Sequence, residues 1–157
     1  MIVKGRVRRQ VLANWQQDVH IDPQKPLFVF ATDGSGLMGQ AWWGSVSMRT
    51  TSAEMLIDKA GFKASNAVTE EAGRVVLNHK MPEYIGATRA TNNTGELMGV
   101  YMALMRAEEC IRAGEKLLIL SDSQLAICTT VGAWVPRHNR ALVMRNRARL
   151  ARLRVWF

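Results

Sequence analysis

The feature that most constrains the fold of this chain is an apolar run, Leu27 to Ala31, that gives way abruptly to Thr32-Asp33-Gly34. Five consecutive nonpolar residues predict a strand that is buried on both faces, as in the centre of a sheet flanked by helices. Asp33 would then lie where this strand leaves the core, and a carboxylate in that place is costly to desolvate unless a cation meets it. We therefore expect a metal ion or another cationic partner beside Asp33. The alternative is that Asp33 and Gly34 form only a turn.

A second apolar run, Leu117 to Leu120, is also followed by a carboxylate, Asp122. The segment 91–94 is rich in capping residues and predicts a helix that carries Glu96 in its first turn. Parallel neighbouring strands would place Asp33 and Asp122 at one edge of the sheet, and a helix that crosses the sheet can deliver Glu96 between them. The sequence therefore predicts one cluster of three carboxylates.

The predicted cluster has a clear chemical use. Carboxylates this close raise each other's pKa and destabilise the fold unless divalent cations neutralise them. Oxygen ligands favour Mg²⁺ or Mn²⁺ over zinc. Two such ions about 4 Å apart can activate a water on one side of a phosphorus and stabilise the leaving 3′ oxygen on the other. Taken singly, Glu96 also fits an ordinary acid at a helix N-terminus, and Asp122 fits a capping residue.

The composition bounds the class of protein. With 157 residues, 48% of them hydrophobic, the chain is long enough for one domain with a core. Its formal net charge of +8 favours a polyanionic partner, which fits nucleic acid and an anionic membrane surface alike. The sequence shows neither a membrane-spanning stretch nor a secretory signal, so we expect an intracellular protein, cytoplasmic by default. Cys110 and Cys128 are expected to be reduced packing residues.

Residues 1–25 form the first predicted unit, a basic amphipathic arm ahead of a globular domain of residues 26–157. Apolar residues recur there at every fourth position between basic ones: Val7, Val11, Trp15 and Val19. The arm has three interpretations: a helix packed on its own domain, an arm that docks on a partner or grips nucleic acid, or an organelle transit peptide.

The next strands are less sharply marked. Residues 40–48 predict a strand with Ala41, Trp43 and Ser45 on one face. We interpret residues 49–72 as an insertion between the second and third strands. Residues 73–81 predict the third strand, which a proline then ends.

Three helices are predicted in the second half of the chain. The first extends from the Thr91 cap toward Gly114, and the second begins at Ser123 and ends near Pro136. The third covers about residues 140–154, and residues 155–157 are expected to begin another strand.

Arginines crowd the last predicted helix, whose apolar residues Val143, Leu150 and Leu153 are expected to point inward. The arginines either grip nucleic-acid phosphates or form a solvated face. They are Arg137, Arg140, Arg145, Arg147, Arg149, Arg152 and Arg154.

Three segments, in this order, resemble the signatures of type 1 ribonuclease H, a family that includes retroelement ribonuclease H domains. They are Asp33-Gly34-Ser35, Thr91-Asn92-Asn93-Thr94-Gly95-Glu96-Leu97-Met98 and Ser121-Asp122-Ser123-Gln124. The resemblance covers about residues 27–157. It implies an α/β, ribonuclease H-like fold with a mixed five-stranded sheet and helices on both faces. It also implies metal-dependent hydrolysis of the RNA strand of RNA–DNA hybrids.

The resemblance implies roles for individual residues as well. Asp33, Glu96 and Asp122 would bind Mg²⁺, or Mn²⁺, and carry the catalysis. Arg140 and Arg145 would grip the DNA strand. A wide, shallow minor groove with 2′-hydroxyl groups lets a protein recognise RNA, and six residues would lie along that substrate path: Gly34, Ser35, Asn92, Asn93, Ser123 and Gln124.

The resemblance further implies a C-terminal segment with a mobile histidine and a fourth aspartate, yet no acidic residue follows Asp122. Three interpretations follow: a truncated chain, a ligand set completed by another chain, or a catalytically inactive ribonuclease H-like module for nucleic-acid binding or protein assembly. A protein partner would then dock on the N-terminal arm or on the incomplete C-terminal edge.

Overall fold

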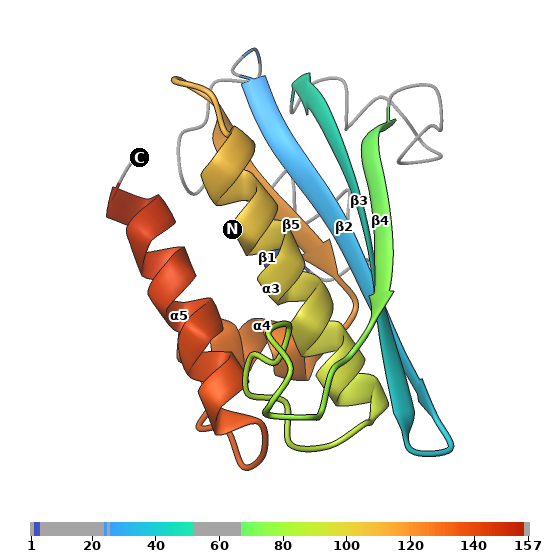
Figure 1. Ribbon diagram of the computed structural model, residues 1–157. Coiled ribbons are helices and arrows are strands. Elements are labelled where there is room, and N and C mark those ends of the chain that lie inside the picture. Colours follow the sequence, from blue (N-terminus) through green and yellow to red (C-terminus); the bar gives the residue numbers. More distant parts are fainter. Residues whose placement is uncertain (1, 4–23, 25, 52–66, 156–157) are drawn as a thin grey trace.

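In the computed structural model, which describes residues 2–3, 24, 26–51 and 67–155, the chain forms a mixed sheet (Figure 1). Its strands lie in the order β1-β5-β2-β3-β4. β5 is parallel to both of its neighbours, whereas β2, β3 and β4 are antiparallel to one another in turn. The predicted mixed α/β sheet is therefore confirmed, and a short strand from the N-terminus forms its edge beside β5. The strand bounds are β1 (Ile2–Val3), β2 (Pro26–Leu37), β3 (Gln40–Thr51), β4 (Ala67–Arg74) and β5 (Lys116–Ser121).

The two apolar runs form the buried centre of this sheet. On one face, Phe28 and Phe30 of β2 join Leu117 and Ile119 of β5 in the hydrophobic core. Successive side chains of a strand point to opposite faces, and the residues that alternate with these are buried too: Leu27, Val29, Leu118 and Leu120. Both strands are thus buried on both faces, as predicted.

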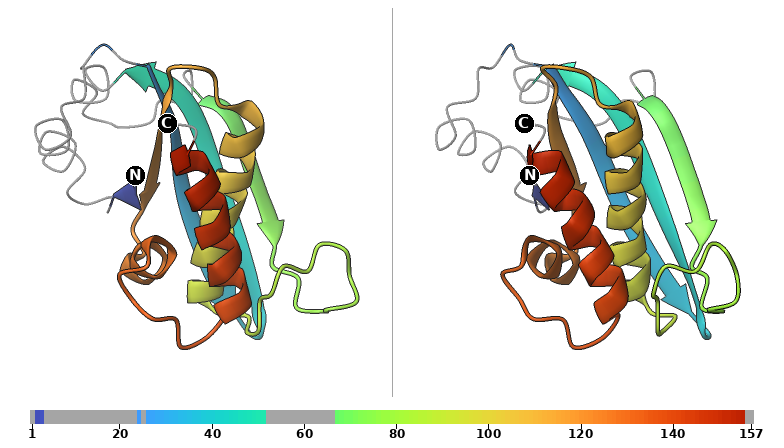
Figure 2. Two further views of the ribbon diagram at one scale, coloured as in Figure 1. Left: turned by 90° about the vertical axis from the view of Figure 1, so that its left-hand side faces the viewer. Right: turned by 60° about the vertical axis from the view of Figure 1, so that its left-hand side comes forward.

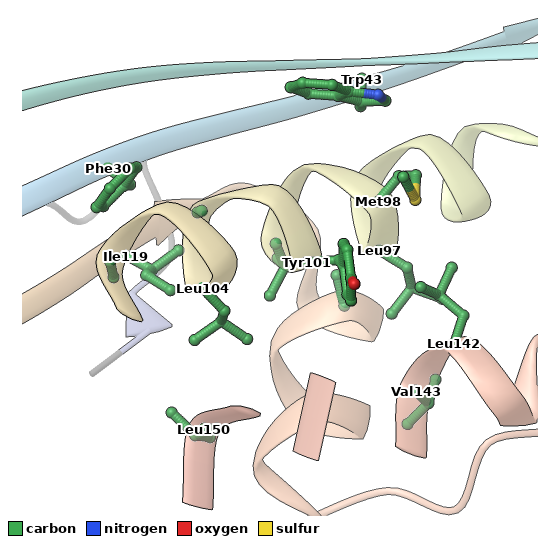
Figure 3. Close-up of a cluster of buried hydrophobic side chains, with 14 of the residues drawn as sticks. Phe30, Trp43, Leu97, Met98, Tyr101, Leu104, Ile119, Leu142, Val143 and Leu150 are labelled. Carbon is green, nitrogen blue, oxygen red and sulfur yellow. The ribbon is translucent and has the colours of Figure 1, made fainter. Parts of the chain in front are cut away.

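Three helices share this core: α3 (Asn92–Cys110), α4 (Gln124–Val131) and α5 (Arg140–Val155). α3 crosses β2 and β3, α5 packs against α3, and α4 contacts α5 and β5 (Figure 2). Figure 3 shows the α3 side chains that face α5 within the core. Because all three helices contribute to the core on the Phe28 and Phe30 side, a helix on the opposite face stays a prediction.

β2 does not end at Asp33. It pairs with β5 only as far as Thr32, but it continues against β3 to Leu37, and the turn follows at Met38 and Gly39, both with positive φ. The alternative of a turn at Asp33-Gly34 is therefore wrong. The physical reason is that glycine inside a strand also marks a close backbone approach, which here is the approach of α3 described below.

β4 differs from the predicted third strand. It spans Ala67–Arg74 rather than residues 73–81, and β3 extends to Thr51, so the end of β3 and most of β4 occupy part of the range 49–72. The apolar pattern was misleading because β4 lies at the sheet edge, where side chains such as Glu70 are exposed. The buried Val75 follows the strand and still donates its N–H to the carbonyl of Ala41 at 2.8 Å. Residues 52–66 lie outside the described residues.

The chain ends also differ in part from the predictions. Val155, which was expected to begin a strand, instead ends α5. α4 stops before Gly132, whose φ of +88° is the left-handed conformation that ends helices. Of the predicted arm of residues 1–25, the structure describes only β1 and residue 24. Residues 156–157 also lie outside the described residues. Within the described ranges, every helix is too short or too polar to cross a membrane.

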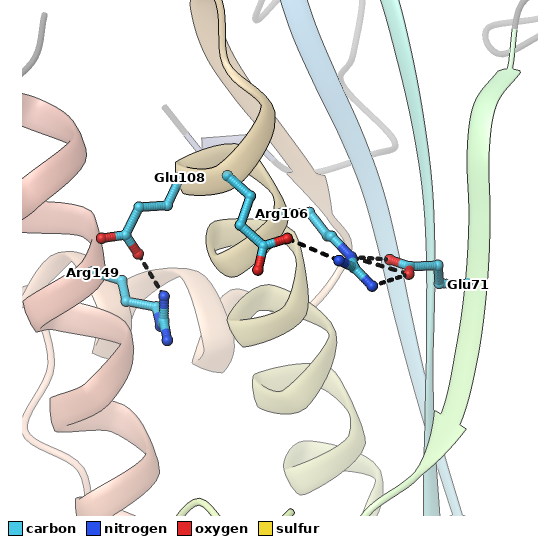
Figure 4. A network of polar contacts seen from close by, with 5 residues as sticks. Glu71, Arg106, Glu108 and Arg149 are labelled. Carbon is cyan, nitrogen blue, oxygen red and sulfur yellow. Dashed lines mark hydrogen bonds and ion pairs between the residues drawn. The ribbon is translucent and has the colours of Figure 1, made fainter.

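Ion pairs tie α3 to the elements on either side of it (Figure 4). Arg149 and Arg152 of α5 both pair with Glu108 of α3, at 2.5 and 2.6 Å. On the sheet side, Arg106 of α3 pairs with Glu71 of β4 at 2.7 Å. Two of the predicted outward arginines therefore join helices and do not form a freely solvated face.

Candidate metal centre

Three carboxylates meet where β5 ends. Asp33 lies in β2, Asp122 follows the last residue of β5, and Glu96 lies on α3. β2 and β5 are parallel with Thr32 opposite Ser121, so the next residue of each segment is an aspartate. One carboxylate oxygen from each of the three acids lies within 4.8 Å of the others. The structure thus brings together the three carboxylates that were predicted to meet.

Glycines allow α3 to approach the sheet closely enough to deliver Glu96. A Cβ atom added at Gly34 would lie 2.1 Å from the backbone nitrogen of Glu96, and one added at Gly95 would lie 2.3 Å from the carbonyl oxygen of Trp42. Only a residue without a side chain leaves room for backbones in such contact. Gly34, which was predicted along the substrate path, therefore has a packing role that fixes the position of Glu96.

Glu96 occupies an unusual environment for an acid. It lies in the second turn of α3 and not in the first as predicted, because the helix begins at Asn92 after the Thr91 cap. Because the helix dipole acts mainly on the first turn, it does not by itself explain an acid at this position. Glu96 is 8% exposed and its Oε2 atom has no hydrogen-bond partner. Burial, and after it the charges of Asp122 and Asp33, raise the pKa of Glu96 to about 7.

This donor set fits a divalent cation. Asp33 and Asp122 are exposed, so an ion can reach them, and the unpartnered Oε2 atom of Glu96 adds a buried acceptor. Carboxylate oxygens are the ligands that Mg²⁺ and Mn²⁺ prefer. A cation would also offset the repulsion that raises the pKa of Glu96. The three residues therefore have the chemistry and the spacing of a metal site.

Two buried asparagines contact α3 on the side away from the sheet. Asn139, with a φ of +52°, donates from Nδ2 to Thr94 Oγ1 at 3.1 Å, and its Oδ1 accepts hydrogen bonds from the segment before α3. Asn146 of α5 donates from Nδ2 to the carbonyl oxygen of Leu97 at 3.1 Å. Neither asparagine was predicted as a site residue, because its partners are distant in the sequence. The two contacts bracket Glu96.

The other residues predicted to contact the substrate fall into two groups. Asn92 and Asn93 are exposed at the start of α3, and Ser35 and Gln124 are exposed as well. These four side chains are accessible to a ligand. Ser123 instead caps α4, where its Oγ accepts a hydrogen bond from a backbone N–H of the first turn at 3.1 Å.

A groove of about 770 Å³ opens beside the first turn of α3. Asn93 of α3 forms part of its wall, and the exposed, amphipathic Trp134 forms another part. Three arginines also line it: Arg89, Arg137 and Arg140. The groove is therefore basic and partly aromatic.

The last arginines take different positions. Arg140, predicted to grip nucleic acid, lines the groove, whereas Arg145 is exposed on α5 and is not among its lining residues. Arg147 donates to the carbonyl oxygens of Thr129 and Trp134 at 2.8 and 2.9 Å, which holds the end of α4 and the segment after it against α5.

Comparison with known proteins rests on structure, since no protein-family model and no curated protein matches this chain. The N-terminal RNase H domain of rv2228c from Mycobacterium tuberculosis is similar, with a TM-score of 0.54 and 23% identity, covering 79% of this chain and 73% of that one. RNase H1 from the archaeon Halobacterium salinarum NRC-1 gives a TM-score of 0.52 and 22% identity, covering 83% and 78%. LC11-RNase H1 isolated from compost gives a TM-score of 0.51 and 17% identity, covering 82% of this chain and 76% of that one. The chain therefore has the fold of these ribonuclease H structures, as its motifs suggested.

Proposed function

We propose that this protein is a metal-dependent endoribonuclease of the ribonuclease H type that hydrolyses the RNA strand of RNA–DNA hybrids. The observation that carries the proposal is the cluster of Asp33, Glu96 and Asp122, with carboxylate oxygens within 4.8 Å of one another. The cluster stands in a fold that resembles solved RNase H structures.

The three acids would hold Mg²⁺ or Mn²⁺. Divalent cations bound in such a cluster lower the pKa of an attacking water and stabilise the charge that develops on the leaving 3′ oxygen. Glu96, with its pKa near 7, is partly protonated at neutral pH, so cation binding would release its proton. The contact between Gly34 and Glu96 would keep the three ligands in place without a large rearrangement.

The surroundings of the cluster support a nucleic-acid substrate. Asn92 and Asn93 offer exposed amide groups at the start of α3, where they can meet sugar hydroxyl groups of an RNA strand. The adjacent groove offers Arg137 and Arg140 to phosphates of the second strand and Trp134 as an apolar surface. A chain of net charge +8 would bind such a polyanion in a salt-dependent manner.

The test is cleavage of an end-labelled RNA–DNA hybrid by the full chain, with duplex DNA and duplex RNA as competing substrates and with Mg²⁺, Mn²⁺ or EDTA. We expect products from the RNA strand of the hybrid only, and only with a divalent ion. Asp33→Asn and Asp122→Asn should each reduce the rate at least 100-fold. Glu109→Gln, an exposed acid at the far end of α3, should retain wild-type activity.

Two outcomes would refute the proposal. One is hybrid cleavage that persists in Asp33→Asn, because the activity would then not come from this cluster. The other is hybrid binding without cleavage in either ion, which would support a catalytically inactive nucleic-acid-binding module instead.

A further inference from the structure

Asn146 is a polar residue in an apolar position. Among the described side chains of α5 it is the only polar one that is buried, with 0% exposure, and it lies between Val143 and Leu150 on the face toward α3. Its Nδ2 donates to the carbonyl oxygen of Leu97 at 3.1 Å. Because a carbonyl oxygen can only accept, the amide nitrogen must be the atom on that side.

The remaining atom of this amide works against folding. Oδ1 of Asn146 is buried and has no hydrogen-bond partner. A buried acceptor without a partner destabilises the folded state, whereas a leucine has the same branching and no polar atom to desolvate. A buried polar residue at a position that favours an apolar one, next to a candidate site, indicates a functional constraint.

The hydrogen bond of Asn146 reaches the turn of α3 that presents Glu96. Leu97 follows Glu96 directly, and Thr94, two residues before Glu96, accepts from Asn139. On the sheet side, the same turn rests against the backbone of β2 at Gly34. This turn is therefore held from both sides, by a strand backbone and by two buried amides.

We propose that Asn146 is a positioning residue for the metal centre. Its amide holds the backbone beside Glu96 against the contact at Gly34 and so helps to keep that carboxylate at its distance from Asp33 and Asp122. This inference rests on the proposed function, in which the three acids bind a divalent cation. Loss of the amide should weaken cation binding and leave the fold as stable as before.

Thr130 provides the matched control. It lies in α4, is 1% exposed, and its Oγ1 is also buried without a hydrogen-bond partner. Asn146→Leu and Thr130→Val each remove such an atom, but only Asn146→Leu also removes a hydrogen bond to α3. Both variants should therefore unfold at the wild-type temperature or above it.

The experiment is a calorimetric titration of the metal-free full chain with Mn²⁺, beside thermal unfolding of each variant. We expect Asn146→Leu to bind Mn²⁺ about tenfold more weakly than wild type, as when the supporting contacts of metal ligands are lost. Thr130→Val should bind as wild type does. In hybrid cleavage, Asn146→Leu should lower kcat and leave KM for the hybrid unchanged.

Unchanged Mn²⁺ affinity in Asn146→Leu would overturn this inference and leave the proposed function standing. Wild-type protein that binds no Mn²⁺ would overturn the proposed function, and the positioning role with it. If leucine does not fit, Asn146→Ala should still show the tenfold weaker binding, although its cavity lowers the unfolding temperature. Wild-type affinity in Asn146→Ala would equally reject the positioning role.

Discussion

Gly34 and Glu96 are in backbone contact: a Cβ atom added to Gly34 would lie 2.1 Å from the backbone nitrogen of Glu96. Gly34 follows Asp33 directly in β2, and Glu96 lies in α3. The contact between β2 and α3 therefore involves one acid, Glu96, and the residue next to the other, Asp33. The separation of the two carboxylates is therefore fixed mainly by a strand–helix contact and less by the rotation of long side chains.

Gly34→Ala should push α3 away from β2. The added methyl group meets backbone atoms that cannot rotate aside, so we expect the free energy of unfolding to fall by about 3 kcal/mol and hybrid cleavage to be lost. Gly44→Ala is the matched control, because Gly44 pairs with Asp33 in the sheet but nothing lies within 4 Å of its added Cβ. Denaturant unfolding measures both variants, and equal losses in the two would contradict the explanation.

The stability of the metal-free protein should depend on the protonation of Glu96. Its pKa is about 7 in the folded protein against an ordinary value of 4.5, so the folded state holds this proton more tightly than the unfolded chain does. Raising the pH from about 4.5 through 7 progressively removes the proton and lowers the free energy of unfolding, by up to about 3 kcal/mol.

Glu96→Gln isolates this effect from that of the other acids. The glutamine carries no titrating proton, so the advantage of the variant in free energy of unfolding should grow as the pH rises through this window. Urea unfolding at several pH values in EDTA measures the difference. A difference that stays constant with pH would show that Glu96 titrates like a solvent-exposed acid.

Glu108 should hold α5 against α3. Its hydrogen bonds from Arg152 and Arg149 lower its pKa, so its stabilisation is present above its ordinary pKa and is lost as the pH falls below it. Glu108→Gln should reduce the free energy of unfolding by about 1–2 kcal/mol at pH 7 and by less at pH 3. Glu109 is more exposed and pairs with Arg106 within α3, so Glu109→Gln should change the free energy of unfolding by at most about 0.5 kcal/mol.

The arginines of the groove and those of the helix interface should behave differently. The double variant Arg137→Ala/Arg140→Ala should weaken hybrid binding about tenfold and reduce the slope of log affinity against log salt by about 2. Arg149→Ala should lower the unfolding temperature and leave that slope unchanged, because its guanidinium is paired with Glu108. Fluorescence anisotropy at several salt concentrations gives the slope, and identical slopes for all three proteins would exclude the groove as a phosphate-binding surface.

The elements of the site that could be predicted are those with a local signal. Each of the apolar runs 27–31 and 117–120 is too hydrophobic for an exposed strand, and each is followed by an aspartate, which is enough to predict that Asp33 and Asp122 meet. The capping residues at 91–94 likewise locate the start of α3. The end of β2 was predicted wrongly because glycine serves equally in turns and in close contacts between backbones, and only the position of α3 decides between them.

The features that were not predicted depend on partners far away in the chain. β4 is an edge strand with few apolar residues, and Glu71 on it pairs with Arg106 of α3. The asparagines 139 and 146 look like surface residues by type, yet each is buried against α3. No local pattern contains such information, because the burial of a polar side chain follows from the packing of two elements.

The place of β5 in the sheet has a consequence for biosynthesis. β5 lies between β1 and β2, pairing Ile119 with both Ile2 and Phe30, although it leaves the ribosome long after either. At roughly 5–20 residues per second, β2 would wait several seconds for its central neighbour. The apolar side chains of β2 and its unpaired backbone edge would be exposed to chaperones and to other nascent chains throughout that delay. Asp122 emerges directly behind β5, so the pairing of β5 with β2 also brings the last of the three acids into place.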